Sequence, residues 1–230
     1  NVQGIELHGE LITYIPPENF DVDGNILADF VASENVVYYI EQADLNPDIK
    51  AIILEIDSPG GLIVASEEIG NALKRVNKPT VALIRAYGNS AAYHVATAAD
   101  VIFASKNSDV GGIGVTMSYL DETKLNQQEG YTYNQLSSAK FKDAGSIDKP
   151  LTYEERQLFM RDVNIMHDNL VESIAENRGM ELETVQDLAD GSSMLGQMAL
   201  ENGLIDEIGG MYEVKDYLKE LIGQQVEICW

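Results

Sequence analysis

The sequence predicts an α/β fold built on a largely parallel sheet. Three runs, at residues 50–57, 80–84 and 101–104, are short, apolar and β-prone, as strands covered on both faces are. The first two are each followed by a turn and a helix-like segment, at residues 63–75 and 90–99. Strands that alternate with helices are joined by crossover connections, which favour a parallel sheet.

Further elements extend this pattern on both sides. Residues 4–14 are predicted as an opening pair of strands, residues 29–43 as a helix and residues 131–136 as a strand. Residues 226–230 are apolar enough for a terminal strand. The later half is more helical, and residues 153–177 form one predicted helix because apolar residues recur there at helical spacing: Phe159, Val163, Met166, Leu170 and Ile174.

The composition excludes several classes of protein and function. The chain has 230 residues, with 15 Lys and Arg against 38 Asp and Glu, which gives a formal net charge of −23. Such an acidic surface repels phosphate, so nucleic acids and anionic membrane surfaces are poor partners. The one cysteine, Cys229, excludes a disulfide within the chain and a cysteine-based metal cluster.

We expect one domain over residues 1–230, because no repeat, low-complexity tract or charged linker divides the chain. No apolar run approaches the roughly 18 residues that span a bilayer. The chain starts at Asn1 rather than Met, which leaves open a processed form with an N-terminal anchor or signal upstream.

A glycine-rich loop at residues 57–61 is the first candidate for chemistry. Gly60 and Gly61 follow a predicted strand and allow backbone N–H groups to point into a cleft, where such donors can hold a developing oxyanion. The alternative is a plain Pro-Gly turn at the entry to a helix.

Ser90 is the second candidate, because it follows a strand and opens a helix. This location resembles the nucleophile elbow of serine hydrolases, although the G-x-S-x-G pattern is absent. The alternative is a serine that caps the helix. His94 lies four residues further on the same helical face, and we interpret it as a structural residue rather than the base that a nucleophilic serine needs.

Two lysines, Lys140 and Lys142, are the third candidate. Lysine can replace histidine as the base when a dry pocket lowers its pKa. In an extended segment Asp143 would point away from Lys142, which would allow this. The alternative is a pair of solvated surface lysines.

In this order, the three signals resemble the signal peptide peptidase family of Ser/Lys proteases, whose fold is shared with Clp protease and the crotonases. The resemblance covers nearly the whole chain, and five stretches carry it: residues 57–61, 90–100, 111–115 and 141–146, and late in the chain 190–191 together with 203–209. The fold that it implies has repeated β-β-α units, a largely parallel sheet and a helical C-terminal part.

The resemblance implies a role for each matching residue. Ser90 would be the nucleophile and Lys142 the general base, with Lys140 as the rival base. The backbone N–H groups of Gly60 and Ala91 would form the oxyanion hole. An extended peptide would bind along Gly61, Gly111, Gly112, Ile113 and Gly114.

The resemblance also implies the partners. Substrates would be hydrophobic peptides such as remnant signal peptides, the chain would form a homo-oligomeric ring, and neither a metal nor an organic cofactor would be needed. The full-length protein would be membrane-associated and face the extracytoplasmic side if it has an anchor, and would otherwise be cytoplasmic.

The sequence departs from the family pattern around the serine. The family often has Ala-Ala before the serine and Gly-Gly after it, whereas Asn89 precedes and Ala91 follows here. His94 stands where an aromatic residue is common, and Gly112 where a serine is common. These departures put a signal-peptide substrate in doubt but retain both Ser90 and Lys142.

Three alternatives remain open at this point. A crotonase-like enzyme would share the fold and the oxyanion hole, but would use Glu or Asp in place of the Ser/Lys pair. A phage or prophage head-maturation protease would share the site and act on scaffold proteins. An inactive scaffold with the protease fold would bind without cleaving.

Overall fold

The structure is a computed structural model, and it describes residues 1–19 and 29–230. The described residues form two compact units. The first unit comprises residues 1–114 and 170–230, and the second comprises residues 115–169.

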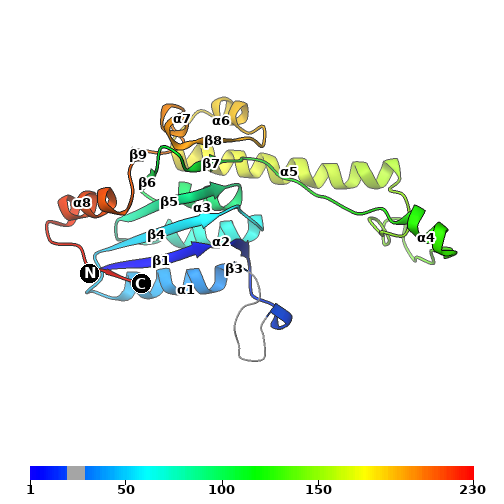
Figure 1. The fold of residues 1–230 in the computed structure, drawn as a ribbon, viewed down its shortest axis with the longest axis horizontal. Helices are drawn as coiled ribbons and strands as arrows, with labels where there is room; N and C mark the ends of the chain where they lie inside the picture. Colours follow the sequence, from blue (N-terminus) through cyan, green and yellow to red (C-terminus); the bar gives the residue numbers. More distant parts are fainter. Residues whose placement is uncertain (20–28) are drawn as a thin grey trace. The chain divides into compact units, whose positions relative to one another are not determined.

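The first unit is organised around an eight-stranded sheet (Figure 1). Six strands follow one another across it, all in parallel pairs: β10 (Ile228–Cys229), β1 (Val2–His8), β4 (Ala51–Ser58), β5 (Thr80–Asn89), β6 (Val101–Ala104) and β9 (Glu207–Ile208). The end of β5 also pairs with β7 (Asp109–Gly111), which pairs antiparallel with β8 (Ser193–Leu195). The largely parallel sheet is as predicted.

A second, two-stranded sheet begins just after β1 along the chain. It consists of β2 (Glu10–Ile12) and β3 (Phe30–Ala32) in a parallel pair. A bridge between Leu11 and Gly61 joins β2 to the loop after β4. A short 3-10 helix, η1 (Pro17–Asn19), follows β2.

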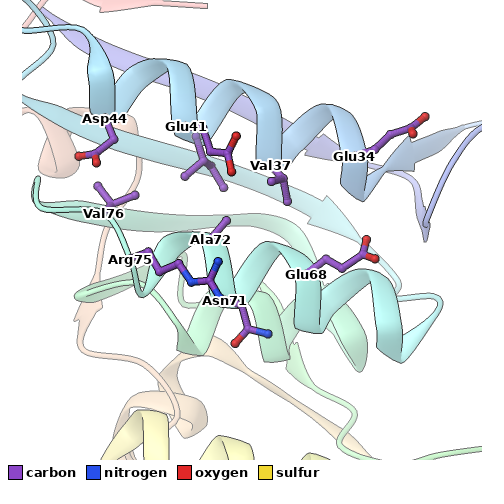
Figure 2. Close-up of a pocket in the computed structure, with 10 residues that line it drawn as sticks. Glu34, Val37, Glu41, Asp44, Glu68, Asn71, Ala72, Arg75 and Val76 are labelled. Atoms are coloured by element: carbon purple, nitrogen blue, oxygen red, sulfur yellow. The ribbon is translucent and has the colours of Figure 1, made fainter.

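Three helices pack in series against one face of the main sheet. These are α1 (Ser33–Leu45), α2 (Ile63–Leu73) and α3 (Ala91–Thr97). A hollow of about 550 Å³ lies between α1 and α2. Most of its charged side chains are carboxylates, and Arg75 is the cation among them (Figure 2). None of the predicted catalytic or oxyanion-hole residues lines this hollow.

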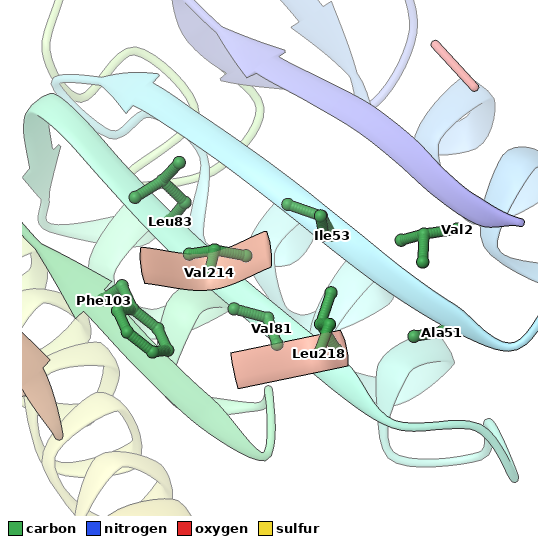
Figure 3. Close-up of a cluster of buried hydrophobic side chains, with 8 residues drawn as sticks. All are labelled: Val2, Ala51, Ile53, Val81, Leu83, Phe103, Val214 and Leu218. Atoms are coloured by element: carbon green, nitrogen blue, oxygen red, sulfur yellow. The ribbon is translucent and has the colours of Figure 1, made fainter. Parts of the chain in front are cut away.

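The opposite face of the sheet is covered by α8 (Met211–Ile222). Figure 3 shows Val214 and Leu218 of α8 over alternate residues of the strands. The cluster is completed by Val2, Ala51, Ile53, Val81, Leu83 and Phe103. The intervening strand residues are buried as well, because the first three helices cover them. Burial on both faces explains why the strands are apolar throughout.

The remaining helices lie in the later half of the chain. The second unit contains α4 (Thr123–Glu129) and the first part of α5 (Tyr153–Arg178), which ends in the first unit. The first unit also contains α6 (Leu182–Leu188) and α7 (Gly196–Glu201). The helix predicted at residues 153–177 is therefore confirmed.

Two predicted elements differ in the structure. The helix predicted from residue 29 begins only at Ser33, because Phe30, Val31 and Ala32 pair with β2 as a strand. The strand predicted at residues 131–136 is wrong, since this segment has no regular structure and all six side chains are exposed. Within residues 1–19 and 29–230, no strand pairs with this segment. The terminal strand is confirmed by the pairing of β10 with β1.

Leu218 tests how much the packing of α8 contributes to stability. Its side chain is fully buried, so Leu218→Ala should lower the free energy of unfolding by about 2–5 kcal/mol in urea denaturation. Leu221 lies on the same helix and is 51% exposed, and Leu221→Ala should change stability by less than about 0.5 kcal/mol. Equal losses in the two variants would show that α8 does not pack as described.

Candidate active site

Ser90 occupies a strained turn between a strand and a helix. It connects β5 to α3 with φ 53° and ψ −124°, and it is the one non-glycine residue with positive φ among residues 1–19 and 29–230. Such a conformation costs on the order of 1–3 kcal/mol, and it persists only where the surroundings impose it. A serine held in this way between a strand and a helix has the character of a nucleophile elbow.

Two backbone hydrogen bonds fix this turn. The Ser90 N–H donates to the carbonyl of Gly111 at 2.7 Å, and the Ser90 carbonyl accepts from the His94 N–H at 3.0 Å. One bond ties the turn to β7 and the other to the first turn of α3. Ser90 thus stands at the N-cap position of α3, but its side chain makes no capping hydrogen bond.

The loop after β4 lies directly against this turn. A Cβ atom placed on Gly60 would lie 2.8 Å from the Ser90 Cβ and 2.9 Å from the Asn89 carbonyl oxygen. Gly60 has φ 113°, a conformation that L side chains rarely adopt. Glycine at position 60 is thus what allows the loop and the serine to meet.

The contact between the Gly60 loop and Ser90 results from the register of β4 against β5. Ile56 pairs with Ile84, but Ser58 pairs with Gly88, so β5 contains two extra residues at an irregularity between these pairs. The shift places residue 60 opposite residue 90. The Tyr87 N–H at the irregularity donates to the Asp57 carboxylate at 3.1 Å.

The predicted oxyanion donors are close together. The Ala91 nitrogen would be 3.2 Å from a Cβ on Gly60, and its N–H is in the first turn of α3, where the helix offers no acceptor. The Gly60 N–H donates to the buried Ser58 hydroxyl at 3.1 Å. Gly61 adjoins it with φ 145°, and a Cβ there would strike the Leu11 carbonyl oxygen at 2.2 Å.

The predicted peptide-binding segment adjoins Ser90. Gly111 ends β7 and pairs with Asn89, and the Gly112 N–H donates to the Ser192 carbonyl at 3.1 Å. The Ile113 carbonyl accepts from the Gly191 N–H at 3.0 Å, and a Cβ on Gly114 would lie 3.1 Å from the Gly191 Cα. This segment is therefore held along one side by residues 191–193.

His94 is buried and hydrogen-bonded at both ring nitrogens. Its Nδ1 lies 2.8 Å from the Ser66 hydroxyl and its Nε2 lies 2.7 Å from the Ser173 hydroxyl. Burial, together with the charge of Lys74, lowers the pKa of His94 to about 4. The ring is thus neutral at neutral pH and already engaged, as befits a structural residue.

Lys142 belongs to the second unit. It lies in a run of turns rather than the extended segment that the sequence suggested, with its N–H donating to the Ala139 carbonyl at 3.2 Å. Its side chain is exposed, and no carboxylate among the described residues forms an ion pair with it. Lys140, by contrast, pairs with Glu154 at 2.7 Å.

The carboxylate of Asp143 contacts residues other than its neighbour Lys142. One oxygen accepts a hydrogen bond from the Tyr133 hydroxyl at 2.7 Å, and the other lies 3.7 Å from the Lys149 Nζ. Lys149 also pairs with Glu155 at the start of α5. The Lys149 and Thr152 hydrogen bonds lower the pKa of Glu155 to about 2. This network anchors the turn that carries Lys142.

Sequence reasoning did not predict the roles of several residues that shape the site, although Asp57 and Ser58 lie in the loop that it named as a candidate. Asp57 holds the strand irregularity, Ser58 binds Gly60, and Asp109 accepts from the Asn89 side chain at 2.9 Å. The partners Ser66 and Ser173 of His94 were missed too. The one signal in the sequence for these two serines was a polar side chain at a position that faces the core. Ser66 fits this description, because it is fully buried. No group of three or more potential metal ligands occurs among the described residues.

The largely parallel sheet and its covering helices form an α/β fold similar to that of Clp protease. A solved structure of a ClpP1 variant from Listeria monocytogenes matches with a TM-score of 0.58 and 16% identity, over 91% of this chain and 92% of that one. At this identity the likeness concerns the fold, which confirms the predicted fold class.

The chain belongs to peptidase family S49, whose family model matches residues 72–225. It is 32% identical over 190 residues to an Enterococcus faecium protein described as a candidate signal peptide peptidase SppA, covering 81% of this chain and 55% of that protein. It is also 23% identical to capsid assembly protease C of phage lambda, covering 75% of this chain and 40% of that protein. The chain spans 55–63% of the length of three curated relatives that it matches.

Gly60 provides a direct test of the contact with Ser90. Gly60→Ala should lower the free energy of unfolding by at least about 1 kcal/mol more than Gly223→Ala, measured by urea denaturation. Both glycines have positive φ, but a Cβ on Gly223 would meet nothing within 4 Å. Only the Gly60 variant therefore adds a steric clash, and equal losses would show that the loop does not press against Ser90.

Proposed function

We propose that this chain is a serine endopeptidase that hydrolyses hydrophobic peptides with Ser90 as nucleophile and Lys142 as general base. The observation that carries the proposal is the strained Ser90 turn with Gly60 packed against it. Membership of a peptidase family supports the reaction class.

The chemistry follows from the roles of these groups. Neutral Lys142 takes the Ser90 hydroxyl proton as the serine oxygen attacks the peptide carbonyl. The resulting lysine ammonium donates that proton to the amine as the peptide C–N bond breaks, which leaves an acyl-serine. Lysine then deprotonates a water that attacks the acyl carbonyl, and the serine recovers its proton.

The oxyanion of each tetrahedral intermediate would be held by backbone N–H groups. Ala91 offers one N–H beside Ser90, and Gly60 offers the second once it exchanges the Ser58 hydroxyl for the oxyanion. A glycine at position 60 allows the loop to lie close to Ser90, because a side chain at this position would clash with the Ser90 side chain.

The surroundings of the two lysines favour Lys142 as the base. A base must approach the serine hydroxyl with an amine that other groups do not hold. Lys140 is held by Glu154 in an ion pair at 2.7 Å, whereas Asp143 is engaged by Tyr133 and Lys149 rather than by Lys142. Lys142 is thus the one of the two lysines that forms no ion pair among the described residues.

The proposed partner is a second copy of the chain. About half of the exposed large apolar side chains in the described residues belong to the second unit, which is a quarter of the chain. Leu136 is 99% exposed and Leu120 is 70% exposed. A concentration of exposed apolar side chains is typical of interaction surfaces, which supports the expected oligomer.

A capsid-maturation role is the second candidate, supported by the likeness to the phage lambda protease. A capsid-maturation protease would use the same catalytic residues as a protease of hydrophobic peptides. The identity of the substrate would therefore distinguish the two functions. Membrane association stays a prediction, and no helix within residues 1–19 and 29–230 has the length and apolar character of a membrane span.

The catalytic roles can be tested by cleavage of a quenched apolar peptide. Ser90→Ala and Lys142→Ala should each reduce kcat by at least about 100-fold, because each removes a group that acts in the transition state. Lys140→Ala is the matched control, and it should retain activity within a few-fold. Full activity in Lys142→Ala would assign the base to another residue, and an inert wild type would favour a scaffold.

The apolar surface of the second unit can be tested by light scattering after size exclusion. Introducing charge with Leu120→Asp and Leu136→Asp together should shift the protein toward monomers, since buried carboxylates are costly at an interface. Leu182→Asp places the same charge at an exposed site in the first turn of α6 and should leave the assembly unchanged. A wild type that is already monomeric would contradict the proposed oligomer.

A further inference from the structure

The imidazole of His94 lies where three elements that shape the proposed site meet. His94 belongs to α3, which starts directly after Ser90. Ser66 belongs to α2, which follows the Gly60 loop, and Ser173 belongs to α5, the helix that follows the Lys142 turn along the chain. The hydrogen bonds at 2.8 Å and 2.7 Å therefore join all three helices through one side chain.

The hydrogen-bonding partners determine the tautomer of the ring. The Ser66 hydroxyl donates to the Ile63 carbonyl at 2.7 Å. A hydroxyl has one proton, so toward His94 the Ser66 oxygen acts as an acceptor and Nδ1 carries the hydrogen. A neutral ring has only one N–H, so Nε2 accepts from the Ser173 hydroxyl. The chain of donors thus runs from Ser173 through His94 and Ser66 to the carbonyl of Ile63.

The backbone of His94 is bonded to the nucleophile's own backbone. Its N–H donates to the Ser90 carbonyl at 3.0 Å, which is one of the two bonds that hold the strained turn. A helix that shifted against α2 would carry this bond with it. Because the strained conformation depends on its surroundings, the position of α3 affects how the Ser90 turn is held.

We propose that His94, as the Nδ1–H tautomer between Ser66 and Ser173, is a positioning residue that holds the Ser90 turn in register with the Gly60 loop. This inference rests on the proposed function, since it assigns His94 an effect on the serine's reaction. His94 touches neither substrate nor reacting atoms, and it acts through α3.

The kinetic test compares an apolar near-isostere with a polar one. His94→Leu removes both hydrogen bonds and should lower kcat for the apolar peptide by about 10- to 100-fold with KM within a few-fold, because small misplacements of a nucleophile cost rate rather than binding. His94→Gln keeps a donor and an acceptor and should recover most of kcat. Ser66→Ala cuts one link and should fall between them.

The matched control is Tyr93→Phe on the same helix. The Tyr93 hydroxyl is buried and donates to the Leu204 carbonyl at 2.8 Å, so this variant also loses a buried hydrogen bond of α3. It does not touch α2 or α5 through that bond, and it should lower the melting temperature while leaving kcat within about twofold. A purely structural role for His94 would make the two variants alike: less stable, with kcat unchanged in the folded protein.

A spectroscopic readout is independent of activity. In protein labelled with nitrogen-15 histidine, His94 should show a protonated Nδ1 and an unprotonated Nε2 at pH 7. The opposite tautomer or an imidazolium would overturn the assigned chain. If the wild type cleaves and His94→Leu keeps full kcat, this inference alone fails. If no Ser90-dependent cleavage occurs in the wild type, the proposed function fails and the inference falls with it.

Discussion

The contact between Gly60 and Ser90 is the constraint on which the rest of the site depends. It arises from a shift in the pairing of β4 with β5, after which Ser58 lies opposite Gly88. Continuous pairing from Ile56 and Ile84 would instead place Ser90 opposite residue 62. The extra residues in β5 therefore decide which loop faces the serine, and the glycine at position 60 decides how closely it approaches.

Hydrogen bonds from several neighbouring elements hold the Gly60 loop and the strained Ser90 turn together. Asp57 accepts from Tyr87 at the irregularity, Gly111 accepts the Ser90 N–H, and His94 donates to the Ser90 carbonyl. These contacts come from elements anchored in a sheet that is buried on both faces. A rigid sheet can hold a costly backbone conformation in place, which is how strain is retained at functional sites.

The sequence was sufficient to predict the central strands of the main sheet and the main helices, because burial and helical spacing leave clear apolar patterns. It failed where an element depends on a partner far along the chain. Residues 30–32 form a strand because they pair with β2. Residues 131–136 are irregular because no strand in the described part of the chain pairs with them. The register shift and the serine partners of His94 could not be predicted, since both depend on long-range geometry rather than on local composition.

The central claim is that Ser90 is a nucleophile whose reactivity depends on Lys142. The most direct measurement is the site and rate of covalent labelling by a serine-reactive fluorophosphonate, with the modified peptide located by mass spectrometry. We expect an adduct on Ser90 in the wild type, and labelling at least about 100-fold slower in Lys142→Ala. An adduct on a different residue, or wild-type labelling rates in Lys142→Ala, would contradict the account.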